Sequence, residues 1–192
     1  MGALINISLN GPVSAWARAA HPWARAVLGV LLAACAAAGP FAAPSAAAEP
    51  GIVGASAPDF ALRSLAGPNM RLSEHRGDVV VLSFWSSRCN VCRAQLAALD
   101  GLYATYRPAG FVVFGVNVDD DPAAAREFAA AQKLQFPMLF DPTKSVARAY
   151  RVDALPMLVA IDRFGAVRYL SRNDKPTAAA EYVPALRKLI DE

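Results

Sequence analysis

The sequence predicts an α/β domain, with a central mixed β-sheet and helices on both of its faces. Two kinds of segment alternate along the chain. The apolar runs at Val79–Trp85 and 111–118 have almost no polar residues, which is typical of strands buried on both faces of a sheet. Between them, residues 92–106 space their apolar side chains as one face of a helix does.

The first elements of this domain form a small hairpin. Residues 59–65 have the composition of a strand, residues 67–69 predict a turn, and residues 70–72 supply the returning strand. Residues 73–77 then close the segment before the first buried strand. The helix at 92–106 ends at the following proline and glycine, so the cysteine pair lies where a strand turns into a helix.

The second half of the domain continues the alternation. A helix opens at Asp121 and Pro122, because proline is favoured in the first turn of a helix. The predicted elements from there are this helix to residue 132, a strand at Met138–Phe140, a helix over 141–150, strands at 157–162 and 166–171, and a final helix over 177–190. The turn at 163–165 makes the last two strands an antiparallel hairpin.

Length and composition limit the functions to consider. The chain has 192 residues, enough for one ordinary domain with extra sequence at an end. Its net charge of +3 is mild and no basic run is interleaved with aromatic residues, so we expect no nucleic-acid partner. Three cysteines are too few for a disulfide framework, which favours chemistry at the closely spaced pair.

Residues 1–48 have the pattern of a secretory signal with an alanine-rich processing region. Arg18 and Arg25 precede an apolar run over 26–38, and no acidic residue accompanies them. The run is shorter than the roughly 20 apolar residues that cross a bilayer, which favours a signal over a transmembrane anchor. We therefore expect an exported protein.

Two outcomes of processing remain open. Ala48 ends a small-residue cleavage site, whereas residues 32–35 resemble a bacterial lipobox in which Cys35 becomes the lipidated N-terminus. Residues 49–54 are expected to be a linker and residues 55–192 the folded domain. The protein would then be periplasmic or on the extracytoplasmic face, soluble after cleavage or lipid-anchored, and attached to a membrane only through its N-terminus.

The Cys-Asn-Val-Cys unit at the start of a helix indicates that its first cysteine is chemically reactive. Unpaired backbone N–H groups and the positive end of the helix dipole both stabilise a thiolate at the first cysteine. Arg88 adds a cation immediately before it. We predict that Cys89 is the exposed nucleophile and Cys92 the resolving thiol, with exchange through a mixed disulfide on Cys89.

Two other interpretations of the pair are a structural disulfide and half of a zinc site. A disulfide that closes so small a loop constrains the unfolded chain very little. Zinc needs two further ligands, and the chain offers only His21, inside the signal, and His75. We therefore expect no metal and no cofactor.

Pro156 is the second feature of interest. It follows Leu155 at the head of the predicted strand over 157–162, a position where sheets admit proline. A cis peptide bond at this position, beside the cysteines, would present backbone groups to a substrate chain.

Several segments together carry a resemblance to a known family. In chain order they are Ala57-Pro58-Asp59-Phe60, residues 77–85, the pair Cys89 and Cys92, residues 111–119, Asp141-Pro142, Leu155-Pro156 and Ile161-Asp162. In order and spacing they resemble the TlpA-like branch of the thioredoxin superfamily, a redoxin or AhpC-TSA-like domain. The resemblance covers residues 54–192.

This resemblance implies a thioredoxin fold with the family's extra helix and strand, a cis bond at Pro156, and dithiol–disulfide exchange outside the cytoplasm. The partners it implies are exported proteins with cysteines or disulfides, which this protein would keep reduced, as in cytochrome c maturation. A second implied partner is an upstream membrane electron donor. The residues expected to support the active site or contact a substrate are Trp85, Arg88, Leu155 and Pro156.

The chain departs from the family's pattern around the cysteines. Arg88 stands where the family commonly has Trp, and Val91 where it commonly has Pro, and both changes should alter redox poise and recognition. The positions where a buried acid often assists proton transfer hold Ser83 and Gln95, and neither acts as a base at neutral pH. This leaves open a role for water or for Glu74.

Two rival functions remain to be weighed. Ser86, three residues before Cys89, is compatible with a thiol peroxidase, but Leu82 stands where peroxiredoxins carry a proline. A non-catalytic thioredoxin-like module that binds copper or a partner protein would depend on His75, the only histidine of the domain.

Overall fold

The computed structural model describes residues 51–172 and 178–192. The predictions for residues 1–48, including cleavage after Ala48 and lipidation of Cys35, lie outside the described residues. Within the described ranges, no helix is long and apolar enough to span a membrane.

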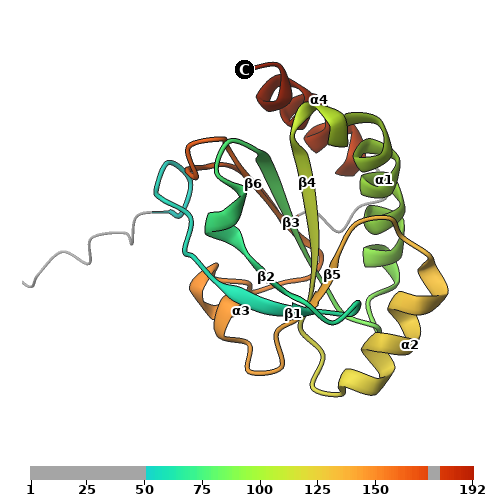
Figure 1. The fold of residues 1–192 in the computed structure, drawn as a ribbon. Helices are drawn as coiled ribbons and strands as arrows, with labels where there is room; N and C mark the ends of the chain where they lie inside the picture. The colour runs from blue at the N-terminus through green and yellow to red at the C-terminus, as the bar shows by residue number, and fades with distance from the viewer. Residues whose placement is uncertain (1–50, 173–177) are drawn as a thin grey trace, which may run out of the picture. The chain divides into compact units, whose positions relative to one another are not determined.

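A seven-stranded mixed sheet forms the centre of the domain, in the strand order β2-β1-β5-β4-β3-β6-β7 (Figure 1). The strands are β1 (Ala61–Ser64), β2 (Asn69–Arg71), β3 (Val79–Trp85), β4 (Phe111–Asn117), β5 (Met138–Phe140), β6 (Met157–Ile161) and β7 (Val167–Ser171). β4 pairs in parallel with β3 and β5, and the other neighbours pair antiparallel. This arrangement confirms the predicted mixed sheet.

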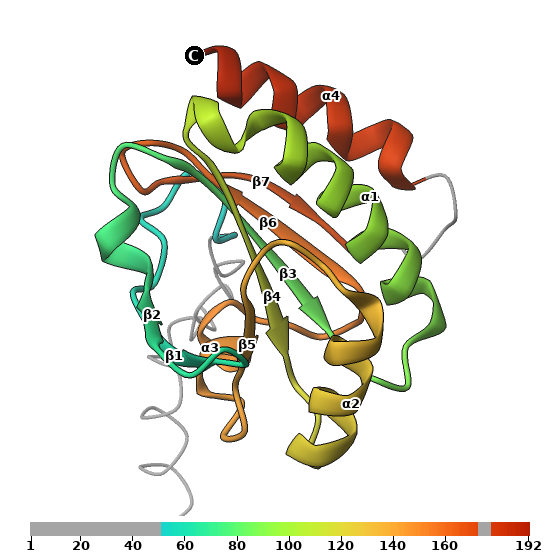
Figure 2. The same cartoon turned by 45° about the vertical axis from the view of Figure 1, so that its right-hand side comes forward.

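Helices cover both faces of this sheet. The helices are α1 (Asn90–Tyr106), α2 (Pro122–Gln132), α3 (Ser145–Ala149) and α4 (Ala178–Asp191), with short 3-10 turns at Leu72–His75 and Arg107–Ala109. α1 and α4 lie side by side over one face (Figures 1 and 2), and α2 packs into the same core cluster. α3 packs into the cluster on the other face. The two-faced arrangement is the one that the sequence predicts.

The buried central strand β3 divides its side chains between the two clusters. Val79, Val81 and Trp85 belong to the cluster under α1, whereas Val80, Leu82 and Phe84 belong to the opposite cluster. Every residue of β3 is buried. Because side chains alternate along a strand, Ser83 shares the α1 side with Val81 and Trp85.

Most predicted elements are confirmed, with ends that differ by one or two residues, and two helices differ for a clear physical reason. The helix predicted to begin at Cys92 begins at Asn90, because Cys89 acts as its N-cap. The helix predicted over 141–150 is only the five-residue α3, because Lys144 adopts a left-handed conformation with φ of 55°. The Asp141 carboxylate accepts hydrogen bonds from the N–H groups of Ser145 and Ala147, and these bonds hold α3 in place.

The extra helix and strand implied by the family resemblance are α2 and β5, which follow β4. The Asp121 side chain accepts from the Ala123 N–H at 2.8 Å and so caps α2, whose first residue is Pro122. This unit places α2 against Trp85 at the end of β3.

Candidate active site

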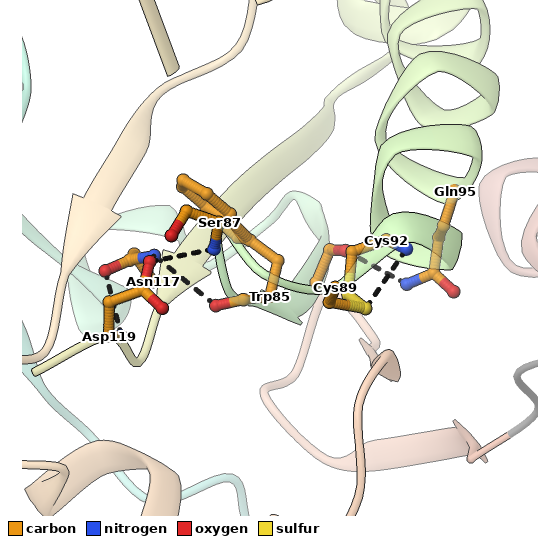
Figure 3. The surroundings of a disulfide bond; sticks show 8 residues. Trp85, Ser87, Cys89, Cys92, Gln95, Asn117 and Asp119 are labelled. Atoms are coloured by element: carbon orange, nitrogen blue, oxygen red, sulfur yellow. Dashed lines mark hydrogen bonds between the residues drawn. A yellow bond between two sulfur atoms is a disulfide. The ribbon is translucent and has the colours of Figure 1, made fainter. Parts of the chain in front are cut away.

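The two paired cysteines lie at the junction between β3 and α1 (Figure 3). They form a disulfide whose Cα atoms are 5.3 Å apart. Cys89 is partly exposed, whereas Cys92 has 1% of its surface exposed. The two sulfurs therefore differ in their access to a partner molecule.

Cys89 caps the helix through its own sulfur. The Sγ atom accepts a hydrogen bond from the Cys92 N–H at 3.2 Å, and the Cys89 backbone is extended, as an N-cap requires. The sulfur lies at the positive end of the seventeen-residue helix α1. Once the disulfide is reduced, these two features stabilise negative charge on Cys89.

A polar network that the sequence reasoning missed braces the loop before Cys89. The Asp119 carboxylate accepts from the Ser87 N–H at 2.8 Å and from the Asn117 side-chain amide at 2.9 Å. Asn117, which is 2% exposed, also donates to the Trp85 carbonyl at 3.5 Å and accepts from the Asp119 N–H at 3.1 Å. The sequence did contain a sign of this network, because Asn117 and Asp119 are polar residues at the end of an otherwise apolar strand.

Trp85 supports the site from beneath. It is fully buried, and its ring stacks on Phe128 of α2 with centroids 4.9 Å apart. The Arg93 guanidinium lies 5.3 Å from the centre of the same Phe128 ring. Trp85 thus fixes the end of β3 and is not accessible to a substrate in this arrangement.

Ser83 and Gln95, which occupy the two positions where an acid was expected, contact each other. The Gln95 Nε2 atom donates to the Ser83 Oγ atom at 3.0 Å, and both residues are buried. Gln95 follows Cys92 by one turn of α1 (Figure 3). Ser83 and Gln95 therefore pair with each other without a charge.

Arg88 and Leu155 line a surface groove of about 610 Å³. The Lys144 ammonium contacts the Asp120 carboxylate across this groove at 2.6 Å. The hydrogen bond and the charge of Lys144 lower the pKa of Asp120, and the nearby Arg88 guanidinium lowers it further. Arg88 directly precedes the partly exposed Cys89, so the groove lies next to the sulfur that a partner can reach.

The Leu155–Pro156 peptide bond is cis, and Pro156 immediately precedes β6. Leu155 is partly buried and packs against both core clusters. Asp153, two residues earlier, accepts from Arg172 at 2.8 Å. The structure thus places Leu155 between the groove and the core.

Glu74 and His75 lie at the wrong end of β3 to serve the cysteines. Both belong to the 3-10 turn that leads into the start of β3, whereas the cysteines follow its last residue. Seven residues of strand separate the two ends by about 20 Å. Glu74 is therefore too far from the cysteines to act as their base, and the role that the sequence left open for it is wrong.

His75 also has local partners. Its Nδ1 atom lies 3.3 Å from the Asp78 carboxylate, and its ring contacts the edge of Phe114 at a centroid distance of 5.1 Å. Among residues 51–172 and 178–192, no group of three or more His, Cys, Asp or Glu side chains is arranged to hold a metal ion. The structure thus gives His75 no metal-binding companions within the part of the chain that it describes.

Fold and site together define a thioredoxin-fold thiol–disulfide oxidoreductase. A family model described as the AhpC/TSA family matches residues 53–170, and the chain belongs to that family. The resemblance to the TlpA-like branch is confirmed.

Named relatives and solved structures agree with this class. The thiol-disulfide oxidoreductase ResA of Geobacillus kaustophilus is 36% identical over 118 residues, which are 62% of this chain and 68% of the relative. A Chlorobium tepidum protein provisionally named thiol:disulfide interchange protein DsbE has a TM-score of 0.63 and 34% identity, over 70% of this chain and 96% of that one. The exposed lipoprotein thioredoxin Etrx1 of Streptococcus pneumoniae has a TM-score of 0.61 and 25% identity, over 69% of this chain and all of that one.

Proposed function

We propose that this protein reduces disulfides of exported proteins, with Cys89 as the attacking thiolate and Cys92 as the resolving thiol. The observation that carries the proposal is the difference between the two sulfurs. Cys89 is half-exposed at a helix N-terminus, and Cys92 is buried one turn inside. A partner sulfur reaches only the first of them.

The proposed reaction has two exchange steps. In the first, the Cys89 thiolate attacks a partner disulfide, a bond forms between Cys89 and one partner sulfur, and the other partner sulfur leaves as a thiolate that takes up a proton. In the second, the Cys92 thiolate attacks the Cys89 sulfur and releases the remaining partner sulfur. Two electrons pass to the partner, and the Cys89–Cys92 disulfide is left.

The groove beside Cys89 supports a polypeptide partner. Its volume of about 610 Å³ and its position between Arg88 and Leu155 suit several residues of an extended chain that flank a substrate sulfur. Pro156 follows Leu155 and immediately precedes β6, and the carbonyl groups of these two residues are the backbone groups that we propose pair with such a chain. Arg88, Leu155 and Pro156 are thus the proposed substrate contacts, and Trp85 is their support.

The proposed location is extracytoplasmic. It rests on the signal-like residues 1–48, with either cleavage after Ala48 or lipidation of Cys35, on the linker at 49–54 and on the domain over 55–192. Because the oxidised protein must be reduced again after each turnover, we infer an upstream membrane electron donor. Exported proteins of the cytochrome c maturation type are the proposed partners.

The test is a redox titration of the full-length protein against glutathione, with Cys89→Ser as the control. A reduction potential near that of thioredoxin, about −270 mV, is expected for a reductant. A value near that of DsbA, about −120 mV, would reverse the proposed direction of electron flow. The absence of any reversible couple would remove the oxidoreductase function altogether.

A trapping experiment identifies the partners. A Cys92→Ser variant should accumulate mixed disulfides with exported proteins, because the resolving thiol is missing. A Cys89→Ser variant should accumulate none, since Cys92 is buried, and Cys35 is replaced by serine in both variants so that it forms no mixed disulfide. Equal trapping by both variants would contradict the assigned roles of the two cysteines.

A separate assay with hydrogen peroxide tests the rival function. Fast consumption of hydrogen peroxide by the reduced protein would favour a thiol peroxidase.

A further inference from the structure

The buried pair beneath the disulfide contains no group that titrates near neutral pH. Gln95 donates to Ser83 at 3.0 Å, and the two side chains are 8% and 1% exposed. We propose that Ser83 and Gln95 are positioning residues that leave the buried Cys92 without an internal base among the described residues, so that its resolving step accelerates with hydroxide. This inference rests on the proposed function.

Burial of Cys92 makes the lack of a base important. A thiolate in an apolar environment is disfavoured relative to the thiol, because the charged form loses its hydration. Cys92 is 1% exposed and belongs to the core cluster that contains Trp85, Leu96 and Leu158. Reduced Cys92 is therefore expected to keep its proton through the neutral range.

The charged groups on the elements nearest to Cys92 are exposed. The loop before α1 and the helix itself carry the cations Arg88 and Arg93. The neighbouring helix α2 carries Arg126 and Glu127, which are also exposed. A cation favours a thiolate but accepts no proton, and Glu127 is exposed, so its carboxylate is hydrated and does not belong to the buried cluster around Cys92.

Among the described residues, the other elements of the cluster add no buried carboxylate, and Glu181 of α4 is exposed. β6 contributes the apolar residues Leu158 and Ala160. α4 contributes Tyr182, and burial raises the pKa of this residue to about 12, so that its hydroxyl stays protonated. The carboxylate after β4, that of Asp119, accepts from Ser87 and Asn117 in the network that braces the loop.

The buried carboxylates of the described residues lie elsewhere. Asp141 accepts from the N–H groups of Ser145 and Ala147 at the start of α3. Asp162 follows β6 at the end opposite to Pro156 and accepts from the N–H groups of the next turn. Neither carboxylate is directed toward Cys92.

The consequence concerns the second exchange step. The Cys92 thiol must lose its proton before its sulfur attacks Cys89, and solvent hydroxide takes that proton. The Cys89–partner bond then breaks, and the released partner thiolate is protonated by water. Below the pKa of Cys92, the rate of this step should rise about tenfold per pH unit.

The experiment uses the reduced full-length protein with Cys35→Ser, so that Cys89 and Cys92 are its only thiols, and an aromatic disulfide reagent that releases a coloured thiolate. The first release reports attack by Cys89, and the second release reports attack by Cys92 on the mixed disulfide. The second rate is measured from about pH 5 to about pH 8, below the ordinary thiol pKa. We expect a straight logarithmic rise without a plateau.

Two variants at position 95 separate chemistry from packing. Gln95→Glu places an ionisable group against Ser83, and it should make the pH profile shallower and raise the rate at neutral pH by on the order of 10²-fold. Gln95→Met fills the same space without a base or an amide, so it should leave the slope unchanged. A purely structural role for Gln95 would shift the rate equally at every pH.

A plateau or inflection in the pH dependence of the second rate of the protein with its native Gln95 below about pH 8 would overturn the inference. This test does not depend on whether any variant at position 95 folds. An unchanged slope in folded Gln95→Glu would also overturn it. The proposed function fails separately, when the first release is no faster than that of free cysteine. A fast first release with an inflected second release refutes only the inference about Ser83 and Gln95.

Discussion

The two ends of the central strands β3 and β4 are built from different chemistry. At the end away from the cysteines, the Arg163 guanidinium donates to the carbonyls of Gly77 at 2.8 Å, Ala109 at 3.2 Å and Ile190 at 3.1 Å. At the cysteine end, the buried polar contact beneath the sulfurs is the uncharged pair of Ser83 and Gln95. A guanidinium joins the elements at one end, whereas the pair beneath the sulfurs at the other end is uncharged.

This difference separates stability from reactivity. Arg163 joins the starts of β3 and β4 to the end of α4, so its loss affects the whole domain. The cysteine end lies where the parallel strands finish, which is where α/β sheets commonly place their reactive groups. There, the helix start and the uncharged pair of Ser83 and Gln95 beneath Cys92 set the state of the two sulfurs.

The largest effect that we expect on stability is that of Arg163→Ala. It removes three hydrogen bonds from a charged donor and should lower the free energy of unfolding by about 3 kcal/mol. The rate of the Cys89 reaction per folded molecule should not change, because the substitution lies at the far end of β3. Denaturant unfolding and the first thiolate release measure the two quantities.

Arg187→Ala is the matched control, because Arg187 is an exposed arginine of α4. It should change the free energy of unfolding by less than about 0.5 kcal/mol. A loss of Cys89 reactivity in folded Arg163→Ala would show that the two ends are not independent.

The cysteine end was partly predictable because its main features are local in sequence. Cys89 and Cys92 lie three residues apart at a junction that the apolar pattern predicts, and the assignment of the helix cap needs no distant residue. Hydrogen bonds between distant positions were not predictable in the same way. Ser83 and Gln95 are each visible in the sequence, but their contact joins a strand to a helix.

Glu74 is a different case. Glu74 precedes the predicted strand and the cysteines follow it, so the strand itself separates them, and the order of the elements alone could have excluded Glu74 as a base. The brace formed by Asn117 and Asp119 was missed because it spans 32 residues to Ser87. Side chains at the ends of adjacent parallel strands meet only once the sheet has formed.

Asn117→Ala should have the next largest effect, at the cysteine end. It removes the buried side chain that contacts Trp85 and Asp119, and it should lower the free energy of unfolding by about 2 kcal/mol. It should also slow the first release at Cys89 by about tenfold, because the loop before Cys89 loses its brace. Both changes are measured as for Arg163→Ala.

Thr105→Ala is the control for Asn117→Ala. Thr105 is exposed and donates to the Gly101 carbonyl within α1, far along the helix from the disulfide. It should leave the Cys89 reaction unchanged. An Asn117→Ala protein that is destabilised but reacts at the wild-type rate would show that the brace serves stability only.

Asp162 allows a pH test of the far end. Burial raises the pKa of its carboxyl, but hydrogen bonds from the Ala166 N–H, from Arg168 and from the Phe164 N–H outweigh this, and the pKa is lowered below its ordinary value. A lowered pKa in the folded state means that the stabilisation is present above about pH 4 and is lost as the pH falls further. Solvent screens part of it, so we expect about 1 kcal/mol.

Asp162→Asn should therefore be less stable than the wild type at neutral pH, and the two proteins should converge in acid. Denaturant unfolding at several pH values measures this difference. A difference that stays constant down to about pH 2 would mean that the charge of Asp162 contributes nothing, and that only the shape of its side chain matters.

The smallest expected effect is that of Lys144→Ala at the rim of the groove. Lys144 is paired with Asp120 in solvent, so water and salt screen its charge, and the substitution should let the pKa of Asp120 rise toward its ordinary value. Exchange with a protein disulfide should change by less than about threefold, and the change should disappear at high salt, because rim charges act on encounter rates. A larger, salt-independent effect would mean that the groove recognises its partner through Lys144, and that charge matters at the cysteine end after all.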